Sequence, residues 1–261
     1  MIRGCDVSSV QGVVPYESLP PELRFCIAKC RQGNDGKDPT FERNMRAGAD
    51  HGLVMGGYHF AYPLPHLDPR VQAEGFYNAA AGHGAGKGEL PPFLDAEWPA
   101  PSVKAPDGTL TYPWRKFGCS SQQISDWLAA CCERMTELFG RKPIIYTYPW
   151  WWAEVSKNVD VSWAAEYPLW MASYTTGGKW PAEGAKPLVP KPWRDWLFWQ
   201  FDGDGGLRLP NGVDADFNVF NGDETVLRRL TGELPEAEPA LPESTRIVHP
   251  LDYVWPDQTG D

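Results

Sequence analysis

The chain of 261 residues has no run of apolar residues that approaches the roughly 20 needed to cross a membrane. Basic residues are also scarce, with 24 Lys and Arg against 34 Asp and Glu, so the formal net charge is -10 at pH 7. Nucleic-acid binding needs a basic surface that faces the phosphates. The sequence therefore argues against membrane insertion and against nucleic acid as a partner.

Cysteines are few, and their spacing matches no metal-ligand pattern. Cys26 and Cys30 fall in a predicted strand, whereas Cys131 and Cys132 are neighbours on a predicted helix. We therefore expect buried free thiols rather than disulfides. No nucleotide-binding motif appears either, so the sequence predicts neither a metal nor another cofactor.

The amino terminus lacks the apolar stretch of a signal peptide and leads directly into a strand pattern at residues 2–7. From this we expect synthesis in the cytoplasm without export by the general secretory route.

Aromatic residues, in contrast, are abundant. The chain holds 13 Trp, 10 Tyr and 11 Phe while its mean hydropathy stays at -0.43. Rings in excess of what a core needs suggest an aromatic-lined cleft, since the flat faces of sugars stack on such rings. The length and the 42% hydrophobic content fit one domain of barrel size.

Strand and helix patterns alternate along the chain, which predicts an α/β fold. The predicted strands cover residues 2–7, 25–30, 53–62, 92–97, 143–148, 168–174, 196–201 and, more weakly, 213–217. The predicted helices cover residues 39–51 with Asp38 as the cap, 68–81, and 120–139 with a serine cap. Helix patterns fade after the fifth strand. The pattern therefore predicts an irregular TIM-like barrel, mostly parallel, whose last strands are joined by loops or short helices.

Two segments differ from the rest in composition. Residues 99–119 are rich in Pro and Gly and follow the fourth strand, which predicts a long loop at the active rim. Residues 233–261 contain many Pro and Glu, which is typical of a linker or a C-terminal tail. We therefore expect a catalytic barrel over residues 1–232 and a tail over 233–261.

The fourth predicted strand ends in two carboxylates, Asp95 and Glu97. Positions two apart in a strand share a face, with Cα atoms roughly 6.6 Å apart. Like charges this close cannot ionise independently, so one carboxyl can stay protonated near neutral pH. Such a pair can cleave a glycosidic bond. The alternative is that both are solvated loop charges.

Seven motifs, in order and at the spacing of barrel strands, resemble the family 25 glycoside hydrolases, which are N-acetylmuramidase lysozymes. They are Asp6-Val7-Ser8-Ser9-Val10-Gln11-Gly12, Gly57-Tyr58-His59-Phe60, Phe93-Leu94-Asp95-Ala96-Glu97, Ile144-Ile145-Tyr146-Thr147, Leu169-Trp170-Met171-Ala172-Ser173-Tyr174, Trp199-Gln200 and Asp216-Phe217-Asn218-Val219-Phe220. The resemblance covers residues 2 to about 230. It implies a (β/α)5(β)3 barrel, with five β/α units followed by three strands.

The resemblance also implies roles for the acidic residues. Glu97 matches the general acid, and Asp95 matches the residue that orients the substrate's 2-acetamido group, whose oxygen attacks the anomeric carbon with net retention. Asp6 and Asp216 match acidic positions that line the same cleft, where their negative field favours the protonated form of Glu97. For Asp6 the alternative is a turn or helix cap. Asp214 competes with Asp216 for the last position.

The aromatic residues near the predicted strand ends are candidates for substrate binding. They are Tyr58, Phe60, Tyr146, Trp170, Tyr174 and Trp199. Each can equally be a packing residue of the core. Trp98 and residues 150–152, all Trp, follow strand ends where active-site loops emerge. His59 alternates away from Tyr58 and Phe60, so we interpret it as structural.

These observations predict a lysozyme that cleaves the β-1,4 bond between N-acetylmuramic acid and N-acetylglucosamine in bacterial peptidoglycan. A phage endolysin fits best, made in the host cytoplasm and reaching the wall through a holin or with a separate wall-binding module. A secreted bacterial enzyme remains an alternative. A chitinase-like hexosaminidase is the second enzyme reading, although its Asp-x-x-Asp-x-Asp-x-Glu motif is absent because Phe93 and Leu94 precede Asp95. A glycan-binding or phage-tail domain without catalysis is the third.

Overall fold

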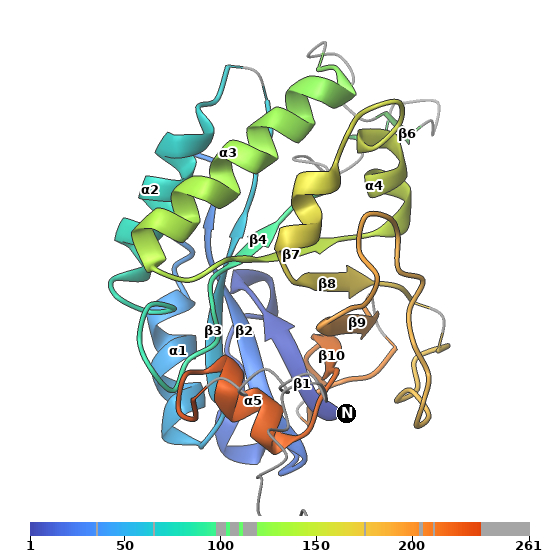
Figure 1. Cartoon of the computed structure of the whole chain (residues 1–261). Coiled ribbons are helices and arrows are strands. Elements are labelled where there is room, and N and C mark those ends of the chain that lie inside the picture. Colours follow the sequence, from blue (N-terminus) through green and yellow to red (C-terminus); the bar gives the residue numbers. More distant parts are fainter. Residues whose placement is uncertain are drawn as a thin grey trace, which may run out of the picture.

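Eight strands form a closed barrel in the computed structural model (Figure 1). The structure describes residues 1–34, 36–64, 66–97, 119–174, 176–203, 206–210 and 212–235, and the backbone of 103–104 and 110–111. Around the barrel the order is β1-β10-β9-β8-β7-β4-β3-β2. The strands are β1 (Ile2–Val7), β2 (Leu23–Gln32), β3 (Val54–Phe60), β4 (Phe93–Asp95), β7 (Ile144–Thr147), β8 (Leu169–Ala172), β9 (Phe198–Asp202) and β10 (Asp216–Phe220). A separate antiparallel pair joins β5 (Val103–Lys104) to β6 (Leu110–Thr111).

Seven barrel strands run parallel to one another, and β10 runs antiparallel to both of its neighbours. The start of β10 therefore lies at the same end of the barrel as the carboxyl ends of the other seven strands. The register pairs Asp6 of β1 directly with Asp216 of β10. Residues far apart in the sequence thus meet at one end, which is where parallel barrels carry their active sites.

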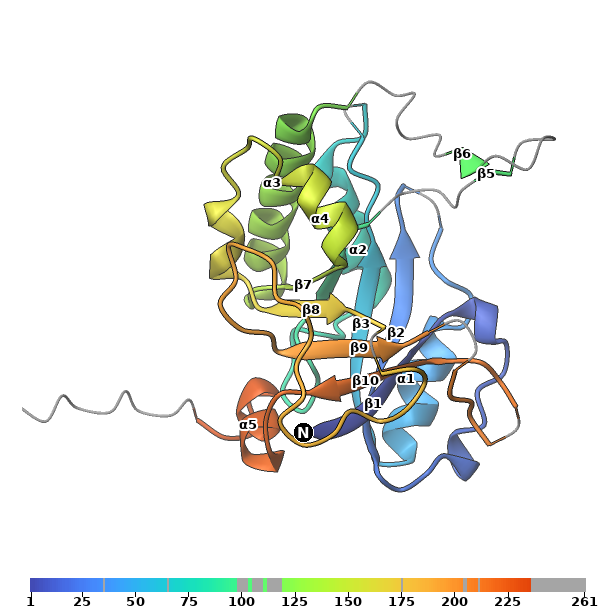
Figure 2. The same ribbon diagram turned by 90° about the vertical axis from the view of Figure 1, so that its right-hand side faces the viewer.

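The α-helices cover one side of the barrel and its amino end. They are α1 (Phe41–Asp50), α2 (Pro69–Ala80), α3 (Ser121–Phe139), α4 (Pro149–Val155) and α5 (Glu224–Leu230). On the side of the barrel that faces the viewer in Figure 2, β8, β9 and β10 are crossed by loop segments and by no helix. The connection from β1 to β2 holds two short 3-10 helices, Ser9–Gln11 and Tyr16–Ser18.

Side-chain alternation along the strands separates two apolar layers. The barrel interior is filled by aromatic and branched side chains, among them Phe25, Phe93, Trp170, Phe198 and Phe220. Leu227 of α5 joins this interior cluster and closes the amino end. The second layer lies between the barrel and its surrounding helices and loops, and includes the thiols of Cys5, Cys26, Cys30, Cys131 and Cys132.

Most of the predicted elements are confirmed. All eight strands and the three predicted helices are present, and every cysteine is a free thiol. The predicted cap Asp38 is wrong, because α1 begins at Phe41 with Thr40 as the N-cap. The carboxylate of Asp38 instead accepts hydrogen bonds from the backbone N–H of Thr40 and of Ser9, which ties the loop after β1 to the start of α1.

The eighth strand begins later than the sequence pattern indicated, at Asp216 rather than residue 213. Residues before it form a turn in which Asp214 pairs with Arg208 and the Leu209 N–H donates to the Val213 carbonyl. The predicted loop at residues 99–119 and the tail beyond residue 235 lie almost wholly outside the described residues. No helix in the described part of the chain is both long and apolar enough to cross a membrane.

Candidate active site

Asp95 stands at the end of β4, between Phe60 of β3 and Tyr146 of β7. Its backbone is held on both sides, since the Ala61 N–H donates to the Asp95 carbonyl and the Ala96 N–H donates to the Tyr146 carbonyl, each at 2.9 Å. The register places the Asp95 side chain in the same interior layer as that of Tyr146. The predicted strand end at residue 97 is wrong, because β4 ends at Asp95. Glu97 follows two residues later, beyond the strand, and is half-buried.

Burial dominates the electrostatics of Asp95, which is only 6% exposed. Burial raises the pKa of its carboxyl well above the usual range, the nearby charges of Glu97 and Asp6 raise it further, and the Lys29 ammonium opposes them. The Asp95 Oδ1 atom is buried and has no hydrogen-bond partner among the described residues. Because buried polar atoms are nearly always hydrogen-bonded, this oxygen indicates a place for a donor on a bound ligand.

Asp6 and Asp216 form a second acidic pair on the β1–β10 side of the same end. The Asp6 Oδ2 atom accepts hydrogen bonds from Asn218 Nδ2 at 2.6 Å and from Gln200 Nε2 at 2.9 Å. Gln200 Nε2 also lies 3.5 Å from Asp216 Oδ2. Burial raises the pKa of Asp6 well above its usual value, and the charge of Asp216 adds to this, although both amides lower it. Asp6 is not a cap, because Ser8 caps the helix that follows β1.

The orientation of the two amides follows from their other partners. The Trp170 indole N–H can only donate, and it donates to Asn218 Oδ1 at 2.7 Å. Gln200 Oε1 accepts from the hydroxyls of Tyr146 at 3.0 Å and Tyr174 at 2.7 Å. Both amides therefore present their NH2 groups to the Asp6 carboxylate. Trp170, Tyr146 and Tyr174 thus hold in place the two amides that bond to Asp6.

The predicted aromatic residues separate into three groups. Tyr58, Tyr146 and Trp170 lie buried inside the barrel, with Tyr146 and Trp170 in edge contact at 4.6 Å between ring centroids. Tyr174 is 53% exposed beside Gln200, and Phe60 is partly buried. These five belong to the end of the barrel that carries the acids.

Trp199 lies on the other face of its strand. It is 1% exposed in the outer apolar layer, and its indole N–H donates to the Ser173 carbonyl at 2.8 Å. The structure therefore gives Trp199 the packing role that was the alternative at the outset, and it does not bring this ring together with the acids.

Three residues of the site were not singled out in the sequence: Lys29, Gln200 and Asn218. Each of them is a polar residue that interrupts an apolar or alternating strand pattern, and this could have been seen in the sequence. Gln200 is the one amide in the buried apolar run Phe198–Phe201, Asn218 repeats the two-residue spacing from Asp216, and Lys29 is the one basic residue in the apolar stretch 25–30. A polar side chain in a buried strand has a partner or a function.

Other residues flagged in the sequence lie away from this site. Asp214 is exposed and its Oδ1 atom lies 3.1 Å from Arg208 Nη2. Trp150 is 83% exposed on α4, while Trp151 and Trp152 are buried in the outer layer. Trp98 lies outside the described residues. His59 is fully buried, stacks on Phe76 and contacts Gln72, which agrees with a structural role.

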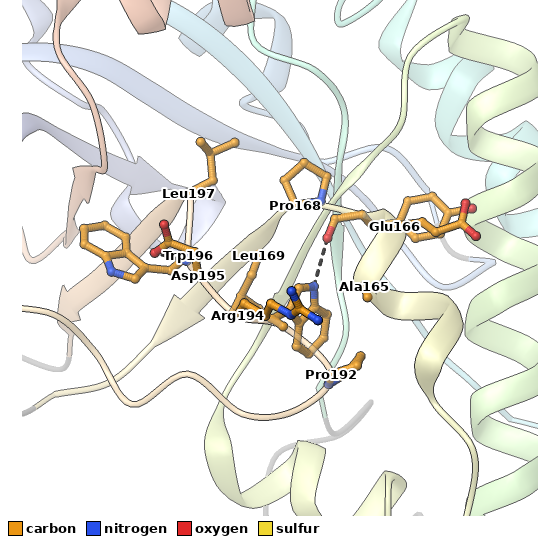
Figure 3. A pocket seen from close by; sticks show the side chains of 11 residues that line it. Ala165, Glu166, Pro168, Leu169, Pro192, Arg194, Asp195, Trp196 and Leu197 are labelled. Carbon is orange, nitrogen blue, oxygen red and sulfur yellow. Dashed lines mark hydrogen bonds between the residues drawn. The ribbon is translucent and has the colours of Figure 1, made fainter. Parts of the chain in front are cut away.

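Within the described ranges, no group of three or more His, Cys, Asp or Glu side chains is arranged to hold a metal ion. The chemistry that the site can offer is that of carboxyl groups. A groove of about 650 Å³ lies elsewhere, at the amino ends of β8 and β9, between residues 165–169 and 192–197 (Figure 3). Because the acidic residues lie at the opposite end of these strands, this groove is not part of the candidate site.

The chain is similar to several known proteins. The model of the family described as "Glycosyl hydrolases family 25" matches residues 5–208. Lysozyme M1 of Streptomyces globisporus is 29% identical over 233 residues, covering 88% of this chain and 71% of that protein. The N,O-diacetylmuramidase of Arthroderma benhamiae is 28% identical over 232 residues, covering 88% and 86%. The crystal structure of the bacterial lysozyme from Streptomyces coelicolor superposes with a TM-score of 0.70 at 28% identity, covering 89% of this chain and 97% of that one.

Proposed function

The chain belongs to family 25 of the glycosyl hydrolases, and from this premise we propose that it cleaves the β-1,4 bond between N-acetylmuramic acid and N-acetylglucosamine in peptidoglycan. The similarity to a lysozyme and to an N,O-diacetylmuramidase supports this substrate. The observation that carries the proposal is the buried Asp95 Oδ1 atom, which finds no donor among the described residues and stands two positions before Glu97. This oxygen would accept a hydrogen bond from the N–H of a sugar's acetamido group.

In the proposed reaction, Glu97 donates its proton to the oxygen that links the two sugars as the bond from that oxygen to C1 breaks. The carbonyl oxygen of the substrate's own 2-acetamido group attacks C1 and forms a cyclic oxazolinium ion. Asp95 accepts the acetamido N–H and stabilises the positive charge of this ion. Water then adds to C1, its proton passes to Glu97, and the acetamido group is restored.

The second acidic pair supports this reaction without taking part in proton transfer. A negative charge shared by Asp6 and Asp216 lies at the end of the barrel where positive charge develops on the sugar. Gln200 and Asn218 hold the Asp6 carboxylate through hydrogen bonds of 2.9 and 2.6 Å. Such preorganised charges cost no rearrangement at the moment of reaction, which makes them effective in catalysis.

The test is the chemistry of the newly formed chain ends. Purified cell walls are digested with the protein, the new reducing ends are reduced with borohydride, and the sugars are analysed after acid hydrolysis. We expect the reduced sugar to be muramic acid. Glucosamine at the new ends would overturn the muramidase proposal, and cleavage of chitin oligomers in preference to walls would favour a chitinase-like hexosaminidase.

We also propose that residues 1–232 form the catalytic unit and that the segment from residue 233 is a linker or tail. The backbone N–H groups of Glu233 and Leu234 donate to the Arg228 carbonyl at 2.9 and 3.1 Å. A truncation after Pro235 keeps both bonds, so it should hydrolyse soluble wall fragments as the full chain does. Loss of folding in this variant would show that the tail is part of the barrel's structure.

That the enzyme serves as a phage endolysin is a further proposal, based on the sequence resemblance. It predicts that the chain, expressed in the cytoplasm of a bacterium whose wall it cleaves, leaves the cells intact until the membrane is permeabilised. Chloroform or a co-expressed holin should then cause rapid loss of turbidity. Lysis without either treatment would contradict holin-dependent release.

A further inference from the structure

A basic side chain, Lys29 of β2, shares the end of the barrel with the acidic residues. It is half-buried and is paired in register with Tyr58 of β3. Its Nζ atom lies 4.8 Å from the centroid of the Phe60 ring. Because Phe60 is the register partner of Asp95, this ammonium is positioned next to the strand that ends at Asp95.

A break in strand register brings a partner for Lys29 onto the same face. The pairing of β2 with β3 shifts between Lys29 and Arg31, so that Lys29 and Gln32 both face inward while Cys30 packs in the outer layer. Gln32 Oε1 accepts from Lys29 Nζ at 2.5 Å. Bulges of this kind occur beside active sites, where they redirect side chains.

The partner of Lys29 is itself held in place. An ammonium only donates, so the Gln32 amide turns its oxygen to Lys29 and its NH2 group to the hydroxyl of Tyr62, with which it forms a hydrogen bond. The backbone of Tyr62 is held by the buried Gln72, which accepts from its N–H at 3.1 Å and donates to its carbonyl at 3.0 Å. These contacts thus hold the Lys29 ammonium in place near the carboxylates of the site.

Charged and titratable groups face Lys29 and Asp95 from several elements. Burial lowers the pKa of Lys29, whereas the carboxylates of Asp95, Asp38 and Glu97 raise it. Asp38 is engaged by the backbone N–H groups of Ser9 and Thr40. The groups that complete the surroundings are Tyr58 on β3, Tyr146 on β7, Asp6 on β1 and Asp216 on β10. Lys29 is the basic group among those that act on Asp95.

Asp95 and Glu97 differ in burial, and this difference opposes the placement of the proton that the reaction needs. Asp95 is buried more deeply than Glu97, so burial alone favours a proton on Asp95. The proposed reaction needs the opposite arrangement, with Asp95 ionised and Glu97 protonated. We propose that Lys29, held by Gln32 and Tyr62, is a positioning residue that stabilises the ionised form of Asp95 against burial and acidic neighbours, and so shifts the proton of the pair toward Glu97. The consequence for catalysis rests on the proposed function, but the position of the proton does not.

The direct test is a titration of the carboxyl groups by NMR of protein labelled with carbon-13 in Asp and Glu side chains. Signals are assigned with the D95N and E97Q variants. In K29M the Asp95 signal should titrate at a pH higher by about one unit, because an opposite charge has been removed, and K29R should restore the wild-type value. An Asp95 titration that is the same in K29M and wild type would overturn the proposal.

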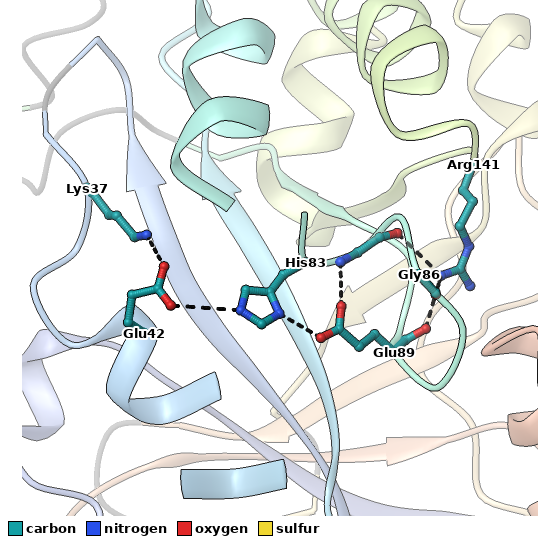
Figure 4. A network of polar contacts seen from close by, with 7 residues as sticks. Lys37, Glu42, His83, Gly86, Glu89 and Arg141 are labelled. Carbon is teal, nitrogen blue, oxygen red and sulfur yellow. Dashed lines mark hydrogen bonds and ion pairs between the residues drawn. The ribbon is translucent and has the colours of Figure 1, made fainter. Parts of the chain in front are cut away.

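Lys37 offers a matched control. Its ammonium also lies over a phenylalanine ring, that of Phe41 at 5.0 Å, and it pairs with the carboxylate of Glu42 where Lys29 bonds to the amide of Gln32. This pair belongs to a separate polar network with His83 and Glu89 (Figure 4). K37M should therefore leave the Asp95 titration unchanged. An equal shift in K37M and K29M would show a general effect of lost charge and would overturn the specific role of Lys29.

The pH dependence of wall hydrolysis is the second readout. If Asp95 must be ionised, the acid limb of kcat/KM should move to higher pH in K29M, with about a tenfold loss at acidic pH that shrinks as the pH rises. A loss of the same size at every pH, with unmoved limbs, would show that Lys29 only supports packing. Should the wild-type protein release no muramic acid ends, the proposed function fails, while the titration still decides where the proton resides.

Discussion

The two acidic pairs at the carboxyl end of the barrel differ in how their oxygens are satisfied. Asp6 receives two amide donors, and those amides are themselves oriented by Trp170, Tyr146 and Tyr174. Asp95 keeps a buried oxygen without a donor among the described residues. A carboxylate that accepts hydrogen bonds from the protein is held in place before any ligand binds. A carboxylate with an unpaired oxygen gains its missing hydrogen bond from the ligand. We propose that Asp6 and Asp216 supply a fixed field and that Asp95 and Glu97 contact the substrate.

The neighbours of each pair explain this difference. Asp6 lies near strands that carry amides on their inner face, Gln200 on β9 and Asn218 on β10. Asp95 lies between Phe60, which has no donor, and Tyr146, whose single hydroxyl proton goes to Gln200. The unsatisfied oxygen is therefore a consequence of which side chains occupy the adjacent strands.

The largest effect should come from Glu97→Gln, which keeps the shape of the side chain and removes the transferable proton. Wall hydrolysis, measured as loss of turbidity, should fall by about 10² to 10⁴-fold. The melting temperature should stay the same or rise, because one of two crowded carboxyls is gone. Near-normal activity in this variant would remove Glu97 from the role of general acid.

Asp95→Asn should cost less, about tenfold to a hundredfold, since an amide oxygen still accepts the acetamido N–H but carries no charge to stabilise the oxazolinium ion. The alkaline limb of the pH–rate profile should move to lower pH, because the negative neighbour that favours the protonated form of Glu97 is lost. A loss larger than that of Glu97→Gln would reverse the assigned roles.

Within the field-forming pair, Asp216→Asn should lower turnover by about tenfold, which corresponds to roughly 1.4 kcal/mol of barrier. Asp214→Asn is the matched control, two residues away but exposed in an ion pair with Arg208, and it should change turnover little. If the control proved the more damaging of the two, Asp216 would have no place in the site.

The smallest effect concerns stability. The pKa of Asp6 is raised in the folded state by burial and by Asp216, so the folded protein binds this proton more tightly than the unfolded protein. The free energy of unfolding therefore falls as the pH rises above the ordinary pKa of an aspartate. Asp6→Asn removes this fall. The melting temperature of this variant relative to wild type, measured by calorimetry, should therefore increase from pH 4 to pH 7. Each kcal/mol of difference in unfolding free energy corresponds to about 2–4 °C. A difference that is flat with pH would show that Asp6 is not held at a raised pKa.

The sequence alone determined the elements and one of the two acidic pairs. Asp95 and Glu97 were predicted as neighbours on one face of a strand; β4 ends at Asp95, so Glu97 lies just beyond the strand, yet its charge still acts on Asp95. Residues 93–95 and 216–220 likewise appeared in motifs that resemble the family, and the strand and helix patterns depend on local periodicity. Asp216 was placed beside Asp6 through that resemblance, and the β1–β10 register supplies the physical contact.

Only the tertiary structure decided which face of each strand looks into the barrel. Trp199 and Gln200 are adjacent in the sequence, yet one packs outside and the other bonds to Asp6. Lys29 faces the barrel interior by alternation from Phe25 and Ile27, but Gln32 joins it on that face only because the register of β2 against β3 shifts between Lys29 and Arg31. In any strand the side chains of adjacent residues point to opposite faces. Closure of the barrel and its strand register decide which of the two faces points inward.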